Sequence, residues 1–231
     1  MRDPATRRRG HGVACAGRTS EPRHTSPRPP GYVCDWQAGG MPPASRVPDE
    51  PRSITRTRSM AASTTDLWEA ISAPGNLENT HPFCARNPVM VWPGPRACDE
   101  VHDSSGWVYR REFTNWIDGR GYDLLIGGGG EQPSMVSWRI DSGTGDGSSL
   151  TITVRPRSLH GSIPDRPERP AQFACVRPLL RRYLASVLQG VDWYLTTGEP
   201  VSKNQFGRHP WFSEPRRPAP VPGRPKLPRP R

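Results

Sequence analysis

The chain has 231 residues, of which 29 are proline, and it contains 32 Lys and Arg against 22 Asp and Glu. Most of the excess positive charge lies near the ends: residues 1–50 hold 8 basic and 5 acidic residues, residues 214–231 hold 6 and 1, and residues 51–213 hold 18 and 16. A domain that binds nucleic acid carries its basic residues on the folded surface, so this distribution argues against a nucleic-acid partner. The sequence has no apolar run long enough to span a membrane.

Both ends of the chain are rich in proline and arginine. Residues 1–50 contain eight prolines and residues 214–231 contain seven, and neither segment has a periodic apolar pattern. Such segments cannot offset the backbone entropy lost on ordering, which is about 1–2 kcal/mol per residue. We therefore predict a disordered N-terminal extension over residues 1–50, one folded domain over residues 51–213 and a disordered tail over residues 214–231. Met41 is a possible alternative start, so translation of residues 1–40 stays open.

The predicted domain begins with a strand and two short helices. Residues 52–60 have the composition of a strand. Ser63 or Thr64 can cap a helix whose first turn contains acidic residues, and the Pro-Gly pair at residues 74–75 ends that helix. A second short helix or turn is expected over residues 77–83.

A series of strands follows. Residues 89–92 form a short apolar segment, and apolar residues then alternate with polar ones over residues 107–116, 122–126, 136–140 and 150–154. The connections between these segments are too short to contain crossover helices, which predicts an antiparallel meander.

The apolar period changes to that of a helix over residues 173–195. Pro178 falls within this segment, where it either kinks the helix or occupies its first turn, and Gly198 is suited to end it. Because this is the longest predicted helix and one face of it is apolar, we expect it to pack on the sheet. The predicted fold class is therefore α+β, with a curved antiparallel sheet around a long C-terminal helix.

This order of elements resembles the helix-grip fold of the SRPBCC superfamily, which includes START lipid-transfer domains and polyketide cyclase/dehydrase-like proteins. The segment AASTTDLWEAISAPGNL, residues 61–77, looks like the entry of that superfamily, and the resemblance extends over about residues 53–195. Shorter segments, such as HPFC at residues 81–84 and NQFG at residues 204–207, resemble bacterial members without an assigned reaction. The resemblance implies a cavity between the sheet and the helix that admits an apolar ligand.

Aromatic residues, one cation and two leucines of the long helix are the candidates for lining such a cavity, although an ordinary packed core would use the same residue types. The candidate ligand-binding residues are Tyr109, Arg111, Phe113, Trp116, Tyr122, Trp138, Tyr183, Leu184 and Leu188. If Arg111 faces inward, it needs a carboxylate partner or an anionic ligand group, and Glu112 then faces solvent. The alternative is an ion pair at the rim of the sheet between Arg111 and Asp123.

No cofactor, metal site or catalytic motif is predicted. The five cysteines include no C-x-x-C pair, and their odd number favours a reducing cytoplasm. The clusters of His81 with Cys84, and of Cys98 with Asp99 and His102, lack the paired ligands of a structural zinc site. No nucleophile motif is present, and no His or carboxylate is clearly placed on an inward face.

The function predicted from the sequence is binding of a hydrophobic small molecule between the sheet and the C-terminal helix. One alternative is an enzyme of the polyketide cyclase or dehydratase type, which needs a polar group inside the cavity. The other is an interaction protein acting through its basic, proline-rich tails. The identity of the ligand, the presence of catalysis and the oligomeric state are left open by the sequence.

Overall fold

The structure, a computed structural model, describes residues 53–128, 132–157 and 170–215. The predicted N-terminal extension lies outside the described residues, and so does the predicted tail apart from residues 214–215. The elements are β1 (Ile54–Met60), α1 (Thr64–Ser72), α2 (Leu77–Thr80), β2 (Cys84–Arg86), β3 (Val89–Val91), β4 (Cys98–Asp103), β5 (Val108–Ile117), β6 (Gly121–Gly127), β7 (Ser134–Ser142), β8 (Ser148–Arg155) and α3 (Pro170–Thr197). None of the described helices is long and apolar enough to cross a membrane.

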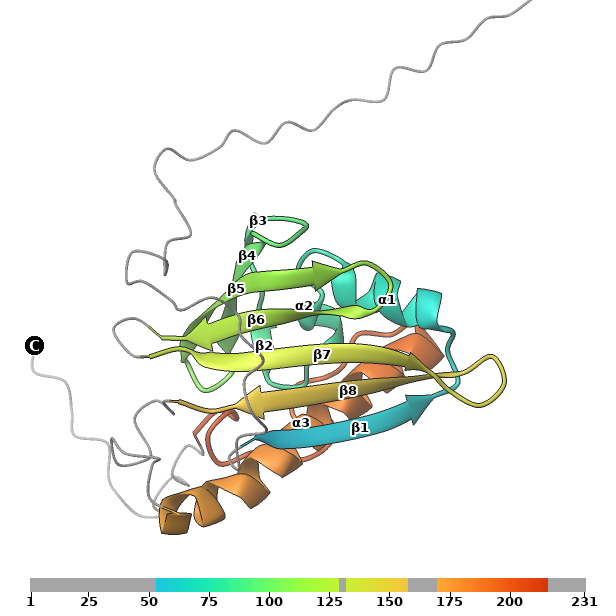
Figure 1. Cartoon of the computed structure of the whole chain (residues 1–231). Helices are drawn as coiled ribbons and strands as arrows, with labels where there is room; N and C mark the ends of the chain where they lie inside the picture. The colour runs from blue at the N-terminus through green and yellow to red at the C-terminus, as the bar shows by residue number, and fades with distance from the viewer. Residues whose placement is uncertain (1–52, 129–131, 158–169, 216–231) are drawn as a thin grey trace, which may run out of the picture. The chain divides into compact units, whose positions relative to one another are not determined.

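The described strands form one antiparallel sheet in the order β1-β8-β7-β6-β5-β4-β2, and β3 also pairs with β4. The 28-residue helix α3 runs along one face of this sheet and contacts β1, while α1 and α2 lie beside it (Figure 1). This arrangement confirms the predicted α+β helix-grip fold. Pro178 lies inside α3 and not in its first turn.

Two strands were not predicted from the sequence. Strand β2 has only three residues. Strand β4 has the sequence CDEVHD, in which Asp99, Val101 and Asp103 are all buried. Because two of the three inward side chains are charged, the hydrophobic alternation that indicates a half-buried strand is missing from β4.

The start of α1 follows from its capping residue. Ser63 is the N-cap, and its Oγ accepts a hydrogen bond from the backbone N–H of Asp66 at 3.1 Å. Leu67 and Ile71, one turn apart on this helix, are completely buried in the core. The cap and the apolar spacing thus agree on where the helix begins and which face it buries.

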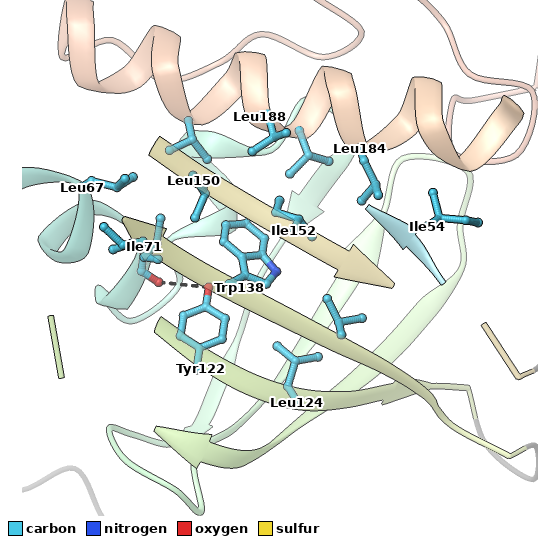
Figure 2. Packing of buried hydrophobic residues seen from close by; sticks show 14 of the residues in the cluster. Ile54, Leu67, Ile71, Tyr122, Leu124, Trp138, Leu150, Ile152, Leu184 and Leu188 are labelled. Atoms are coloured by element: carbon cyan, nitrogen blue, oxygen red, sulfur yellow. Dashed lines mark hydrogen bonds between the residues drawn. The ribbon is translucent and has the colours of Figure 1, made fainter. Parts of the chain in front are cut away.

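The core lies between α3 and the sheet. Leu184 and Leu188 point from α3 towards Trp138, Leu150 and Ile152 on β7 and β8 (Figure 2). Helix α3 approaches α2 closely at Gly190, where a Cβ would lie 2.1 Å from the backbone oxygen of Thr80.

An irregularity in β5 decides which aromatic residues face the core. The pairing of β5 with β6 shifts between Phe113 and Asn115, so that Phe113 lies opposite Leu124 and Trp116 lies opposite Tyr122. Without this bulge, strict alternation would place Trp116 on the face opposite to Phe113. With it, the Phe113 and Trp116 rings lie 5.4 Å apart between centroids.

Candidate ligand cavity

A cavity of about 130 Å³ lies between the inner face of the sheet and α3. Strands β4 to β8 and helix α3 provide most of its wall, and α2, the segment after α2 and the segment after α3 complete it. Its lining is mainly apolar, with a few polar side chains. The lining residues are Leu77, His81, Val101, Asp103, Tyr109, Arg111, Leu124, Ile126, Gly127, Gly128, Ser134, Val136, Trp138, Ile152, Val154, Leu180, Tyr183, Leu184, Val187 and Phe212.

The residues proposed from the sequence divide into two groups. Those that line the cavity are Tyr109, Arg111, Trp138, Tyr183 and Leu184. The other four, Phe113, Trp116, Tyr122 and Leu188, belong to the packed core and are not among the lining residues.

The core aromatic group is held by ring contacts and one hydrogen bond. The centroid of the Tyr122 ring lies 5.0 Å from that of Phe113 and 5.6 Å from that of Trp138. The Tyr122 hydroxyl donates to the backbone oxygen of Ile71 at 3.4 Å (Figure 2). Burial raises the pKa of Tyr122, so its hydroxyl stays protonated and keeps this bond.

Arg111 is buried and paired with a carboxylate on the neighbouring strand β4. Its Nε donates to Asp99 Oδ1 at 2.7 Å, its Nη2 donates to Asp99 Oδ2, and a longer bond of 3.4 Å joins Nη2 to Asn87 Oδ1. Burial alone would lower the pKa of Arg111, but the Asp99 carboxylate raises it overall, so the guanidinium stays charged. This bidentate pair supplies the carboxylate partner that an inward Arg111 requires.

Two expectations about β5 are therefore wrong. Arg111 does not pair with Asp123, because Asp123 accepts from Arg139 Nη2 at 2.6 Å. Glu112 does not face solvent: it is buried, and its Oε1 lies 3.1 Å from Nε of Arg110. The partner of Arg111 follows from the register, in which Arg111 lies directly opposite Asp99.

His81 and Tyr183 form a hydrogen-bonded pair at the cavity. The Nε2 atom of His81 lies 2.8 Å from the Tyr183 hydroxyl oxygen, and His81 Nδ1 accepts from the backbone N–H of Phe83 at 3.2 Å. Burial, with a contribution from the charge of Arg111, lowers the pKa of His81 to about 3. The imidazole is therefore neutral at pH 7, and the histidine is a fixed member of the cavity wall.

Asp103 adds an ionisable group to the same cavity. Its Oδ1 accepts from the backbone N–H of Ser105 at 2.9 Å. Burial raises the pKa of Asp103 to about 7, although hydrogen bonds from Ser105 and Ser104 act in the opposite direction. A carboxyl group with this pKa can hold or release a proton near neutral pH.

The segment after α3 closes part of the cavity wall. The Phe212 ring lies 4.3 Å from the Tyr183 ring between centroids, and His209 is buried with its Nε2 3.1 Å from the backbone oxygen of Leu179. The backbone N–H of His209 donates to Ser213 Oγ at 2.7 Å. These contacts hold Phe212 against the end of the cavity at Tyr183.

Sequence reasoning did not identify three of these groups. The sequence analysis places His81 only in a cluster with Cys84 that lacks the paired ligands of a zinc site, and it does not predict that Asp103 or Phe212 lines the cavity. The segment HPFC was recognised as family-like, which was the one available signal for His81. In the described part of the chain, no three His, Cys, Asp or Glu side chains are grouped so that they could hold a metal ion.

No protein-family model matches the sequence, and no curated protein matches it significantly. Solved structures do match the fold. A START superfamily protein from Mycobacterium smegmatis aligns with a TM-score of 0.51 and 11% identity, covering 62% of this chain and 97% of that one. Protein SA2116 of unknown function from Staphylococcus aureus aligns with a TM-score of 0.50 and 10% identity, covering 63% and 95%.

A third structure, DynU16 from the dynemicin biosynthetic locus, aligns with a TM-score of 0.48 and 18% identity; the alignment covers 64% of this chain and 49% of DynU16. The chain thus spans about half the length of that protein. The two structures with TM-scores of 0.51 and 0.50 show that the domain has the helix-grip fold of START-like proteins, which confirms at the level of fold the SRPBCC resemblance seen in the sequence.

Proposed function

We propose that this domain, which has the helix-grip fold of START-like proteins, binds an apolar molecule about the size of one aromatic ring between the sheet and α3. The observation that carries the proposal is the mainly apolar cavity of about 130 Å³ between the sheet and α3. An apolar cavity of about 150 Å³ holds one benzene molecule. The size of the ligand is therefore limited by the volume that the side chains leave free.

The lining supports this proposal because it combines much apolar surface with few polar groups. Aliphatic residues of β6 to β8 form one wall, and Leu180, Leu184 and Val187 of α3 form the opposite wall. Burial of a phenyl-sized group between two such walls contributes about 1.5–3 kcal/mol relative to exposure in water. Binding sites for small molecules have this composition in general.

Ethylbenzene is a suitable probe, with binding followed by chemical-shift changes in two-dimensional NMR spectra of the protein. Val154 lines the cavity, so Val154→Phe should occupy part of the volume and abolish binding. Val89 is exposed on β3, so Val89→Phe adds the same volume outside the cavity and should leave binding unchanged. Absence of saturable ethylbenzene binding to the wild-type protein, or equal binding by both variants, would contradict the proposal.

A second candidate function is acid–base catalysis on a molecule held in the same cavity. The specific observation in its favour is Asp103, whose pKa of about 7 suits a group that transfers protons at neutral pH. Cyclase-type or dehydratase-type chemistry needs such a group beside the substrate. Exchange of the α-protons of phenylacetone in D₂O, measured by NMR, should be faster with wild type than with Asp103→Asn. Equal rates would exclude this role for Asp103.

We also propose the cytoplasmic location that is expected from the sequence. Cys84 and Cys98 are buried free thiols, which fits a reducing compartment. Measurement of the location of a tagged full-length protein in its native host tests this directly.

A further inference from the structure

The polar side chains of the cavity differ in what they can offer to a ligand. We propose that Tyr183 donates a hydrogen bond to an acceptor oxygen of a neutral ligand, such as a ketone or ether, and that the cavity rejects carboxylates. This inference rests on the proposed function, because it specifies the chemistry of the ligand that the cavity holds. Three features of the cavity carry it.

The first feature is the direction of the hydrogen bond between His81 and Tyr183. Because His81 Nδ1 accepts from the Phe83 N–H, the proton of the neutral imidazole must reside on Nε2. His81 Nε2 therefore donates to the Tyr183 oxygen across their separation of 2.8 Å. The phenol proton of Tyr183 is not used in this bond and remains available.

The second feature is the position and protonation of that phenol. Tyr183 lines the cavity and is only partly buried within the fold. Burial and the nearby Asp103 raise its pKa, so the hydroxyl stays protonated. The described residues provide no acceptor for its proton. A ligand oxygen in the cavity can supply the missing acceptor, and an unsatisfied hydroxyl in an apolar site favours ligands that do so.

The third feature is the balance of charge. Arg111 is the only cationic side chain among the described residues that line the cavity, and Asp99 already occupies its guanidinium in a bidentate pair. Asp103, the other charged residue of the lining, is acidic. A ligand carboxylate would therefore enter an apolar cavity without a free cationic partner, which is strongly unfavourable.

Three probes with one shared ring separate these effects: ethylbenzene has no acceptor, acetophenone has a ketone, and benzoate has a carboxylate. Dissociation constants are measured by NMR titration at pH 7.5 for wild type, Tyr183→Phe and Tyr194→Phe. Tyr183→Phe should weaken acetophenone binding about three- to tenfold, the effect of one neutral hydrogen bond, and should leave ethylbenzene binding unchanged. Tyr194 lies on the same helix but is not among the residues that line the cavity, so Tyr194→Phe should change neither affinity. Benzoate should bind to wild type at least about tenfold more weakly than acetophenone.

A second measurement needs no variant. The carbonyl stretch of ¹³C-labelled acetophenone should move to lower frequency on binding to the wild-type protein, because a donated hydrogen bond weakens the C=O bond. An unshifted band, an acetophenone affinity that does not depend on Tyr183, or benzoate binding as tight as acetophenone would overturn the inference while the proposed function stands. Failure of all three probes to bind to the wild type would overturn both.

Discussion

Truncation of Leu184 tests whether the space beneath α3 exists in solution. Leu184 and Leu188 are one turn apart, each is 2% exposed, and only Leu184 lines the cavity. Leu→Ala in a packed core costs about 2.7–5 kcal/mol, and the larger values arise where packed neighbours lose their contacts. Leu184 already faces empty space on one side, so Leu184→Ala should cost about 2–3 kcal/mol and Leu188→Ala about 4–5 kcal/mol.

Urea denaturation with a constant m-value measures both costs. Arg182 is the matched control on the same helix, because it is exposed and its Nη2 only donates to the backbone oxygen of Arg208 at 3.1 Å. Arg182→Ala should change stability by less than about 0.5 kcal/mol. Ethylbenzene affinity should rise in Leu184→Ala and stay constant in Leu188→Ala. Equal costs for the two leucines would refute the cavity, and costs as small as that of Arg182→Ala would refute docking of α3 on the sheet.

Three further changes have defined outcomes. Asp99→Ala leaves the guanidinium of Arg111 buried and unpaired, so it should lower the free energy of unfolding by about 3–5 kcal/mol in urea denaturation. Gly190→Ala places a methyl group against the Thr80 oxygen and should cost about 1–3 kcal/mol, read as a lower midpoint of thermal unfolding. The raised pKa of Asp103 in the folded state contributes stability at pH 4 that is lost as the pH rises to about 7. The unfolding free energy of Asp103→Asn minus that of wild type should therefore increase over this range, by at most about 1.4 kcal/mol per pH unit. A difference that does not change with pH would show that Asp103 is hydrated.

The elements with a regular apolar period could be predicted from the sequence. The spacing of Leu180, Leu184 and Leu188 identified α3 and its buried face, and alternation identified β5 to β8. The rest depended on contacts that local patterns do not encode. Strand β4 was missed because Asp99 and Asp103 occupy inward positions that alternation reserves for apolar residues.

The site could be predicted only in part for a similar reason. Arg111 was recognised as a possible inward charge, but its partner lies on the unpredicted strand β4. His81 meets Tyr183 across 102 positions of the sequence, and Phe212 reaches the cavity from the segment after α3. Such pairings follow from the way in which the sheet and α3 come together, and single residues give no signal of them.

The Asp99–Arg111 pair also affects the register of β4 against β5 near the end of the sheet. Strands β2 and β3 are short and pair irregularly with β4, so they contribute little to fixing its register. If β4 slipped by one residue along β5, Arg111 would face Cys98 or Glu100 in place of Asp99, and the side chains of β4 would exchange faces. Asp99 would then leave the interior, and the desolvated guanidinium of Arg111 would remain there without a partner. The pair thus helps to set the register of β4 against β5, because a shifted register leaves Arg111 unpaired. The apolar content of β4 is too low to set this register by itself.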